Sequence, residues 1–174
     1  MTDPARPFAP TQTAATQVGK GAAADRRRPA GTPPRINVRA LLVEGGRIML
    51  TNVRGQSTFH LPGGPVEAGE TIQAALRRQL DKQADIEASH VTFVGCVEGT
   101  RIERGTRVAE LDVIFSVDRS WAAEFGSRLD DLDVVSTPLS SLGDLQLQPE
   151  ALRSLIPDWL QHGRPLWQGA TTAR

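Results

Sequence analysis

The chain has 174 residues with 39% hydrophobic and 23% charged residues, which fits one globular domain of ordinary composition. Its formal net charge of zero gives no support for a nucleic-acid or anionic-membrane partner, and its single cysteine excludes an internal disulfide. No apolar run approaches the roughly 18 residues of a membrane span, and no apolar stretch near the N-terminus resembles a secretory signal, so we expect a cytoplasmic protein.

Residues 1–35 are rich in Ala, Pro, Thr, Gly and Arg, with no apolar periodicity. Their six basic and two acidic residues give a net charge of +4, which leaves −4 for the remainder of the chain. Such a segment buries too little apolar surface to offset its ordering entropy, so we predict a disordered tail. The arginine run 26–28 fits a solvated linker or a contact with an acidic partner.

The folded domain is expected over residues 36–163. INVRALLV (36–43) alternates and then becomes continuously apolar, as a buried strand does. RIMLTNV (47–53) follows after a glycine-containing turn. The two segments together predict a hairpin.

Three further strands are expected later in the chain. Residues 90–100 and 107–117 have strand patterning and are separated by a turn that contains Gly105. Residues 119–132 are irregular, and 132–142 is predicted to be the last strand, which ends in a turn.

Two helices are predicted, over 71–84 and 149–160, because apolar residues recur there every three to four positions. Pro149 suits the first turn of the second helix, and Pro157 is expected to kink or break it. Residues 164–174 are expected to be a C-terminal tail. The predicted buried faces are Ile72, Leu76, Leu80 and Ala84 in the first helix and Leu152, Leu155, Ile156, Trp159 and Leu160 in the second.

One motif carries the functional information. Residues 61–86 read LPGGPVEAGETIQAALRRQLDKQADI, which resembles the Nudix box, the signature of a family that hydrolyses nucleoside diphosphates linked to another moiety. The resemblance covers about residues 36 to 162. It implies an α/β fold, the Nudix-type α/β/α sandwich with a mixed β-sheet. The box positions that match are Gly64, Glu70, Arg78, Leu80 and Ile86.

The box departs from the family where the family binds metal. Gln79, Lys82 and Gln83 stand in place of three helix carboxylates, and Asp85 stands in place of a glycine that ends the helix, where we expect a positive φ. The resemblance implies Mg²⁺ or Mn²⁺ bound by those carboxylates. Repulsion between a divalent ion and Lys82 at about 4 Å is roughly 8 kcal/mol at an effective dielectric constant of about 20. Asp81 points to solvent and cannot substitute, so no metal is expected on the box helix.

Other parts of the box are retained. Glu70 and Arg78 match the family's ion pair between loop and helix, with a structural role or, alternatively, a catalytic one. Glu67, Glu70 and Glu110 are the candidate metal ligands if the domain is a hydrolase, together with the Gly63 carbonyl. For Glu110, an exposed surface carboxylate is the alternative interpretation.

The residues expected to bind a ligand belong to the box or lie near it. Gly63 and Gly64 match the loop that approaches the substrate, because glycine tolerates the dihedral angles required. Arg54 matches an arginine that meets substrate phosphate, or is simply solvated. The complete set is Arg54, Gly63, Gly64, Gln79, Lys82 and Gln83.

Three functions remain open from the sequence. The first is a domain with a degenerate motif that binds a nucleoside-diphosphate-type ligand with little or no hydrolysis and no cofactor. The second is an active Nudix hydrolase that uses Mg²⁺ or Mn²⁺ to cleave the pyrophosphate of a nucleoside diphosphate linked to another moiety. The third is an interaction scaffold. The expected partner is a nucleotide-like small molecule, and a homo-oligomer is left open.

Overall fold

The computed structural model describes residues 33–88, 90–118 and 127–169. The predicted disordered tail therefore lies outside the described residues up to position 32. Arg35, the last residue of the predicted tail (1–35), begins the first strand. Of the predicted irregular segment 119–132, residues 128–131 form bends and turns before a strand that begins at Leu132.

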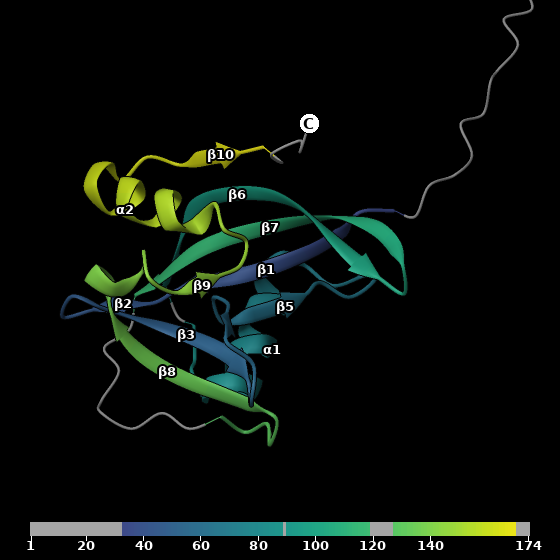
Figure 1. Cartoon of the computed structure of the whole chain (residues 1–174), viewed down its shortest axis with the longest axis horizontal. Coiled ribbons are helices and arrows are strands. Elements are labelled where there is room, and N and C mark those ends of the chain that lie inside the picture. The colour runs from purple at the N-terminus through teal and green to yellow at the C-terminus, as the bar shows by residue number, and fades with distance from the viewer. Residues whose placement is uncertain (1–32, 89, 119–126, 170–174) are drawn as a thin grey trace, which may run out of the picture. The chain divides into compact units, whose positions relative to one another are not determined.

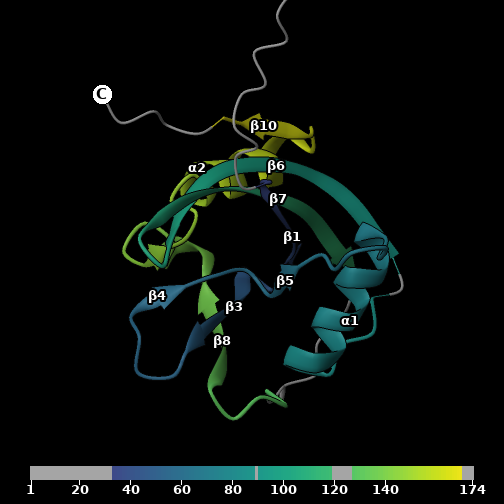
Figure 2. The ribbon, with the colours of Figure 1, turned by 90° about the vertical axis from the view of Figure 1, so that its right-hand side faces the viewer.

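The described residues form a mixed five-stranded sheet, ordered β10-β6-β7-β1-β5, a three-stranded sheet, β2-β3-β8, and a two-stranded one, β4-β9 (Figure 1). One helix lies on each side of these sheets (Figure 2). The strands are β1 (Arg35–Leu41), β2 (Val43–Glu44), β3 (Arg47–Val53), β4 (Thr58–Phe59), β5 (Gly63–Pro65), β6 (His90–Glu103), β7 (Thr106–Asp118), β8 (Leu132–Pro138), β9 (Gln146–Leu147) and β10 (Leu166–Gln168), and the helices are α1 (Ile72–Ala84) and α2 (Leu152–His162), with a 3₁₀ turn over Leu139–Ser141.

The hairpin predicted from 36–43 and 47–53 is wrong in its extent. β1 leaves for the large sheet, where it pairs in parallel with β7 and antiparallel with β5. Only β2 pairs with β3, which continues antiparallel to β8. The apolar run switches sheets between Leu41 and Val43, and this brings both faces of the run into packed layers.

The predicted pair of long strands is confirmed and is longer than expected. β6 and β7 pair antiparallel from His90 and Asp118 to Glu103 and Thr106. Arg104 and Gly105 between them have φ angles of 49° and 79°. Two consecutive residues with positive φ suit a tight hairpin turn, which allows pairing to continue up to the turn.

Strand alternation divides the apolar residues between two cores. In β3, Ile48 and Leu50 pack in the cluster that contains the α2 residues Leu152 and Ile156, whereas Met49 packs in the cluster of α1. Because successive side chains of a strand point to opposite faces, one strand serves both cores. The sheets therefore lie between two helices, as predicted.

The first helix forms close to its predicted bounds. The Thr71 hydroxyl accepts a hydrogen bond from the backbone N–H of Ala74 at 3.2 Å, which caps the helix N-terminus. Asp85 ends the helix with a φ of 54°, as expected for the residue in place of glycine. Leu76, Leu80 and Ala84 are buried as predicted, and Ile72 is half-buried; the buried face also includes Gln79 and Gln83.

The second helix begins at Leu152, three residues later than predicted. The N–H of Leu152 donates to the carbonyl of Pro149 at 3.0 Å, so Pro149 belongs to a turn that precedes the helix. Pro157 lies inside the helix, which continues to His162 and is not broken. Leu160, predicted to be buried, is 41% exposed.

The segment 164–174, expected to be a tail, contains β10. This strand pairs in parallel with β6, and a Cβ added to Gly95 of β6 would lie 2.1 Å from the carbonyl oxygen of Leu166. Gly95 therefore permits the close approach of the two strands. Within the described residues, neither helix has the length and apolar character needed to cross a membrane.

Candidate functional site

The loop before α1 is packed tightly against β1. Gly63 in β5 pairs with Arg39, and a Cβ added to Gly63 would lie 2.0 Å from the carbonyl oxygen of Val38. The φ of Gly63 is 141°, a conformation that other residues rarely adopt. This position therefore requires glycine on two grounds, one steric and one conformational.

Two glutamine side chains fasten this loop to α1. The Gln83 Oε1 atom accepts from the Gly63 N–H at 2.9 Å, and its Nε2 donates to the Gly63 carbonyl at 2.8 Å and to Gln79 Oε1 at 3.1 Å. Gln79 lies against Gly64, where an added Cβ would be 2.8 Å from Gln79 Nε2. Gln79 and Gln83 are buried. We refer to the hydrogen bonds that join Gly63 to Gln83 and Gln83 to Gln79 as the amide clamp.

The amide clamp occupies the face where the Nudix box has its carboxylates. The Gly63 carbonyl, a metal ligand in the hydrolase interpretation, here accepts an N–H hydrogen bond from Gln83. Lys82 on the same helix is exposed, with no hydrogen bond or ion pair to the described residues. Mg²⁺ and Mn²⁺ need charged oxygen ligands to replace their bound water. The residues present on this helix therefore do not fit a divalent metal.

The other candidate ligands are not gathered into one site. Glu67 and Glu70 line an open groove beside Pro65 of about 710 Å³, whereas Glu110 lines a different pocket. Glu110 lies 3.8 Å from the guanidinium of Arg101. Among the residues that the structure describes, no group of three or more His, Cys, Asp or Glu side chains has a metal-binding arrangement.

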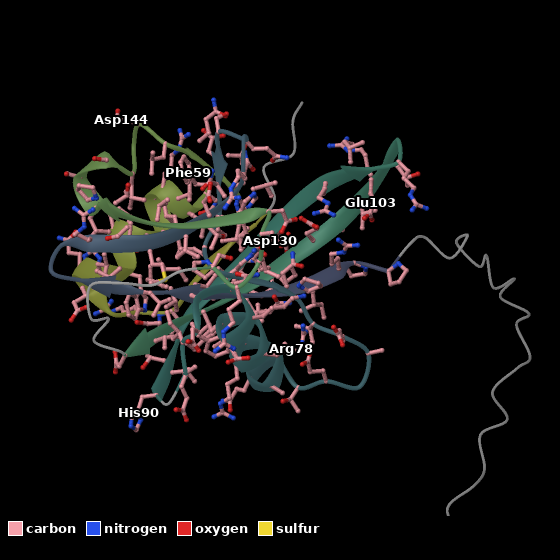
Figure 3. All side chains as sticks on the ribbon, turned by 90° about the horizontal axis from the view of Figure 1, so that it is seen from below. Phe59, Arg78, His90, Glu103, Asp130 and Asp144 are labelled. Atoms are coloured by element: carbon pink, nitrogen blue, oxygen red, sulfur yellow. The ribbon has the colours of Figure 1, made fainter. Side chains whose placement is uncertain are left out.

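Glu70 and Arg78 form a two-pronged ion pair between the loop and α1. Arg78 Nε and Nη2 donate to the two carboxylate oxygens of Glu70 at 2.8 Å each, and Nη2 also donates to the Pro65 carbonyl at 3.1 Å. Glu67 lies 3.3 Å from Arg78 Nη1. Arg78 projects from α1 toward this loop (Figure 3). The hydrogen bonds from Arg78 lower the pKa of Glu70 to about 2.

This pKa predicts an acid-dependent contribution to stability. A carboxyl group with a folded-state pKa of about 2, below its usual 4.5, stabilises the fold above pH 4.5. The stabilisation is lost as the pH falls from 4.5 through 2. We therefore expect Glu70→Gln to lower the free energy of unfolding at pH 7 and to have progressively less effect between about pH 4.5 and 2.

Urea unfolding of both proteins across this pH range is the measurement, and Glu87→Gln, an exposed acid beyond α1, is the control. A Glu70→Gln effect of constant size from pH 7 to pH 2 would show that the ion pair does not set the pKa.

A separate polar pocket of about 350 Å³ opens between β1, β6, β7 and the segment that precedes α2. We name it the Arg39 pocket. His60 is positioned there by two backbone hydrogen bonds with Thr51, at 2.8 and 2.9 Å. The polar side chains that line the pocket belong to Arg39, His60, Arg101, Glu110, Asp112 and Gln148.

The charges in the Arg39 pocket are arranged in pairs. Arg39 Nε donates to Asp112 Oδ1 at 3.0 Å, and Arg39 Nη1 donates to the Leu61 carbonyl at 3.3 Å. Asp112 is 2% exposed, so its charge is compensated mainly by Arg39. Burial lowers the pKa of His60, and the neighbouring Arg39 lowers it further. His60 is therefore neutral at pH 7.

A model of the NUDIX domain matches residues 33–158 of the chain. The chain belongs to the Nudix family. A comparison with curated proteins found no match.

Solved Nudix structures have the same fold as the chain. The MutT protein of Bacillus halodurans has 16% sequence identity and a TM-score of 0.65, over 79% of this chain and 90% of that one. The MutT protein of Methanosarcina mazei has 18% identity and a TM-score of 0.62, over 76% and 96%. The NUDIX domain of Shewanella oneidensis NrtR, solved with ADP ribose, has 16% identity and a TM-score of 0.60, over 75% and 91%. The predicted Nudix-type α/β/α sandwich is confirmed.

In this Nudix domain the predicted ligand-binding residues do not share one pocket. Gly63, Gln79 and Gln83 are joined in the amide clamp. Arg54 lies in the turn that follows β3, with its side chain 65% exposed, and pairs with Asp133 at 3.1 Å. None of these residues lines the Arg39 pocket.

The Arg39 pocket was not predicted from the sequence. A signal for it exists, because Arg39 and Asp112 are charged residues with apolar neighbours on both sides in their strands. A charged side chain that is buried needs a partner of opposite charge. Arg39 on one strand and Asp112 on another are therefore candidate partners. Gln148 and Arg101 carry no comparable signal.

Proposed function

We propose that this Nudix domain binds a nucleoside-diphosphate-type ligand and does not hydrolyse it with a metal on the box helix. The observation that carries the proposal is the amide clamp, in which Gln83 uses both its carbonyl and its amino group on Gly63.

The amide clamp opposes metal binding for a chemical reason. The amino group of Gln83 lies against two oxygens, the Gly63 carbonyl and Gln79 Oε1. A cation that took these oxygens as ligands would have to displace that amino group, and no box carboxylate would compensate for the lost hydrogen bonds. The loop is instead fastened to the helix by neutral groups.

The alternative hydrolase would use Glu67, Glu70, Glu110 and the Gly63 carbonyl. Glu67 and Glu70 both pair with Arg78, and Glu110 lies near Arg101. A metal would need to attract these carboxylates away from their arginines and gather them from two pockets. The arrangement favours binding without hydrolysis.

Two observations support a nucleotide-type ligand. The family hydrolyses nucleoside diphosphates linked to another moiety, and a Nudix domain of similar fold was solved with ADP ribose. The Arg39 pocket is concave and contains several convergent polar groups, as ligand sites do. ADP-ribose is therefore the first probe to use.

The proposal is tested by calorimetric titration of ADP-ribose into the protein, once with EDTA and once with about 5 mM Mg²⁺. We expect the two dissociation constants to agree within about twofold, because the affinity for ADP-ribose does not depend on metal. We also expect hydrolysis products to form no faster than in a solution without the protein.

Two exposed arginines provide a matched comparison. Arg101→Gln, in the Arg39 pocket, should weaken binding about tenfold or more, whereas Arg47→Gln, on β3, should not. Turnover near the usual enzymatic range of about 1 s⁻¹ or above, dependent on Mg²⁺ and abolished by Glu70→Gln, would establish the hydrolase instead.

A further inference from the structure

Exposed apolar side chains gather on one face of the five-stranded sheet. Among the described residues, the exposed large apolar side chains are Ile36, Val53, Phe93, Ile102, Leu160 and Trp167. All of these except Val53 and Leu160 belong to strands of the five-stranded sheet. The register of the strands shows that these four side chains share a face.

Paired residues of neighbouring strands point to the same face of a sheet, and successive residues of one strand alternate between faces. Ile36 of β1 pairs with Leu111 of β7. Ile102 of β6 pairs with the residue four positions before Leu111, an even spacing, and therefore joins the same face. Cys96, six positions before Ile102, lies there too, and Trp167 of β10 pairs with Cys96.

Phe93 extends this face along β6 toward the start of that strand. It pairs with Phe115, four positions after Leu111, and the two rings meet edge to face with centroids 5.8 Å apart. The helix on this side, α1, packs against β1 and β5 and leaves the part of the face on β6 and β10 exposed (Figure 2). We name this surface the Trp167 face, and it consists of Ile36, Phe93, Ile102, Leu111 and Trp167.

The Trp167 face has the size of a protein interface. Trp167 is 64% exposed and Phe93 41%, and a whole aromatic side chain covers about 150–250 Å², so these two residues leave roughly 200 Å² accessible. Ile36 and Ile102, at 41% and 63%, bring the patch into the range of about 300–600 Å² that is often functional. Each partner of a standard interface buries about 800 Å², of which about 65% is apolar in homodimers. The patch and its polar rim together approach that area.

The charges on this face favour a second copy of the chain as the partner. In the described strands of the sheet, the register places two charged residues on it, Arg107 opposite Ile102 and Glu98 further along β6. A two-fold axis brings a surface against itself, so this face can pair Arg107 of one copy with the partner's Glu98 twice. An anionic membrane or an acidic protein would instead require an excess of basic residues on the face.

We propose that the Trp167 face is the interface of a homodimer, in which the large sheets of two copies pack face to face about a two-fold axis. Packed sheets bury the apolar side chains of both facing surfaces in one core. Trp167 and Ile102 are the most exposed of these side chains and therefore lose the most accessible surface on association. Tryptophan is also enriched among the residues that contribute most binding energy at interfaces. The homodimer does not rest on the proposed function.

Sedimentation equilibrium of the full chain between about 1 and 200 µM is the test. We expect a monomer–dimer equilibrium with a dissociation constant of about 1–50 µM. Trp167→Ala and Ile102→Glu should each raise this constant at least tenfold. Both side chains are largely exposed, so circular dichroism and the unfolding temperature of the variants should stay close to those of the wild type.

The paired charges allow a compensation experiment. Arg107→Glu puts two acids on the face and Glu98→Arg puts two basic residues there, so each variant alone should dimerise more weakly than the wild type. An equimolar mixture of the two should recover the wild-type affinity, because the acidic face of one then meets the basic face of the other. Val53→Glu is the matched control, since Val53 is also exposed, at 39%, but lies on β3 of the three-stranded sheet, and it should leave the dissociation constant unchanged.

Two results would overturn the homodimer directly. One is a chain that stays monomeric at about 200 µM, and the other is a dimer whose dissociation constant is unchanged in Trp167→Ala and Ile102→Glu. Co-sedimentation with vesicles of phosphatidylcholine and phosphatidylserine examines a different occupant. Vesicle binding by a monomeric chain, lost in Trp167→Ala, would assign the face to a lipid surface and reject the dimer.

Discussion

Gly63→Ala is expected to prevent folding or to lower the free energy of unfolding by more than about 4 kcal/mol, the range of exceptionally damaging substitutions. The added Cβ would lie 2.0 Å from the Val38 carbonyl oxygen, and the φ of 141° strains any other residue. Relief would require β5 to separate from β1, which would also break the hydrogen bonds between Gly63 and Gln83. Circular dichroism and denaturant unfolding are the measurements.

Gly69→Ala is the control for this prediction. Gly69 has a φ of 80°, but an added Cβ would have no neighbour within 4 Å. Its loss should be limited to the backbone strain, about 1–2 kcal/mol. If the free energy of unfolding falls by similar amounts in both variants, the close approach of β5 to β1 is not the cause of the loss in Gly63→Ala.

Restoring the box carboxylates with Gln79→Glu, Lys82→Glu and Gln83→Glu is expected to make the fold dependent on metal. Gln79 and Gln83 are buried, and the new carboxylates would face each other and the Gly63 carbonyl in place of the amide clamp. Uncompensated buried charge costs about 3–5 kcal/mol, so the metal-free triple variant should be destabilised by about that amount at pH 7.

The same change should create affinity for a hard cation. We expect the triple variant to bind Mn²⁺ at least tenfold more tightly than the wild type, a difference of about 1.4 kcal/mol or more. Because Mn²⁺ would bind the folded state, saturating Mn²⁺ should raise the unfolding temperature of the variant and leave that of the wild type unchanged. Calorimetric titration and thermal unfolding with and without EDTA measure both effects.

Gln73→Glu, an exposed change on the same helix, is the control and should alter neither stability nor Mn²⁺ affinity appreciably. A triple variant as stable as the wild type in EDTA would show that the amide clamp does not hold the loop. A wild type that binds Mn²⁺ as tightly as the variant would remove the reason given for the absence of hydrolysis.

Much of the fold could be predicted because its local signals agree with its packing. The spacing of Leu76 and Leu80 indicates both the first helix and its buried face. The glycine at position 105 marks the turn of the long hairpin. The path of β1 could not be read, because an apolar run carries no mark where the chain passes from one sheet to another.

The candidate site was predictable only in part. The loss of the carboxylates at Gln79 and Gln83 can be read from the sequence, and their mutual hydrogen bond cannot, because it depends on burial of both amides. The ion pair of Glu70 and Arg78 has a fixed spacing within the box, so it could be predicted. Arg101 reaches the Arg39 pocket from a distant strand, a relation that only the folded chain creates.

The pairing of β10 with β6 determines where this domain can be truncated without exposing a strand edge. The match to the family model ends at residue 158, inside α2, whereas the packed structure continues through Leu166 to Gln168. A fragment trimmed to the family boundary would lose the strand that covers Gly95, Cys96 and Val97 and would expose that edge of the large sheet. Unpaired strand edges recruit other strands, so the short C-terminal strand guards the domain against aggregation.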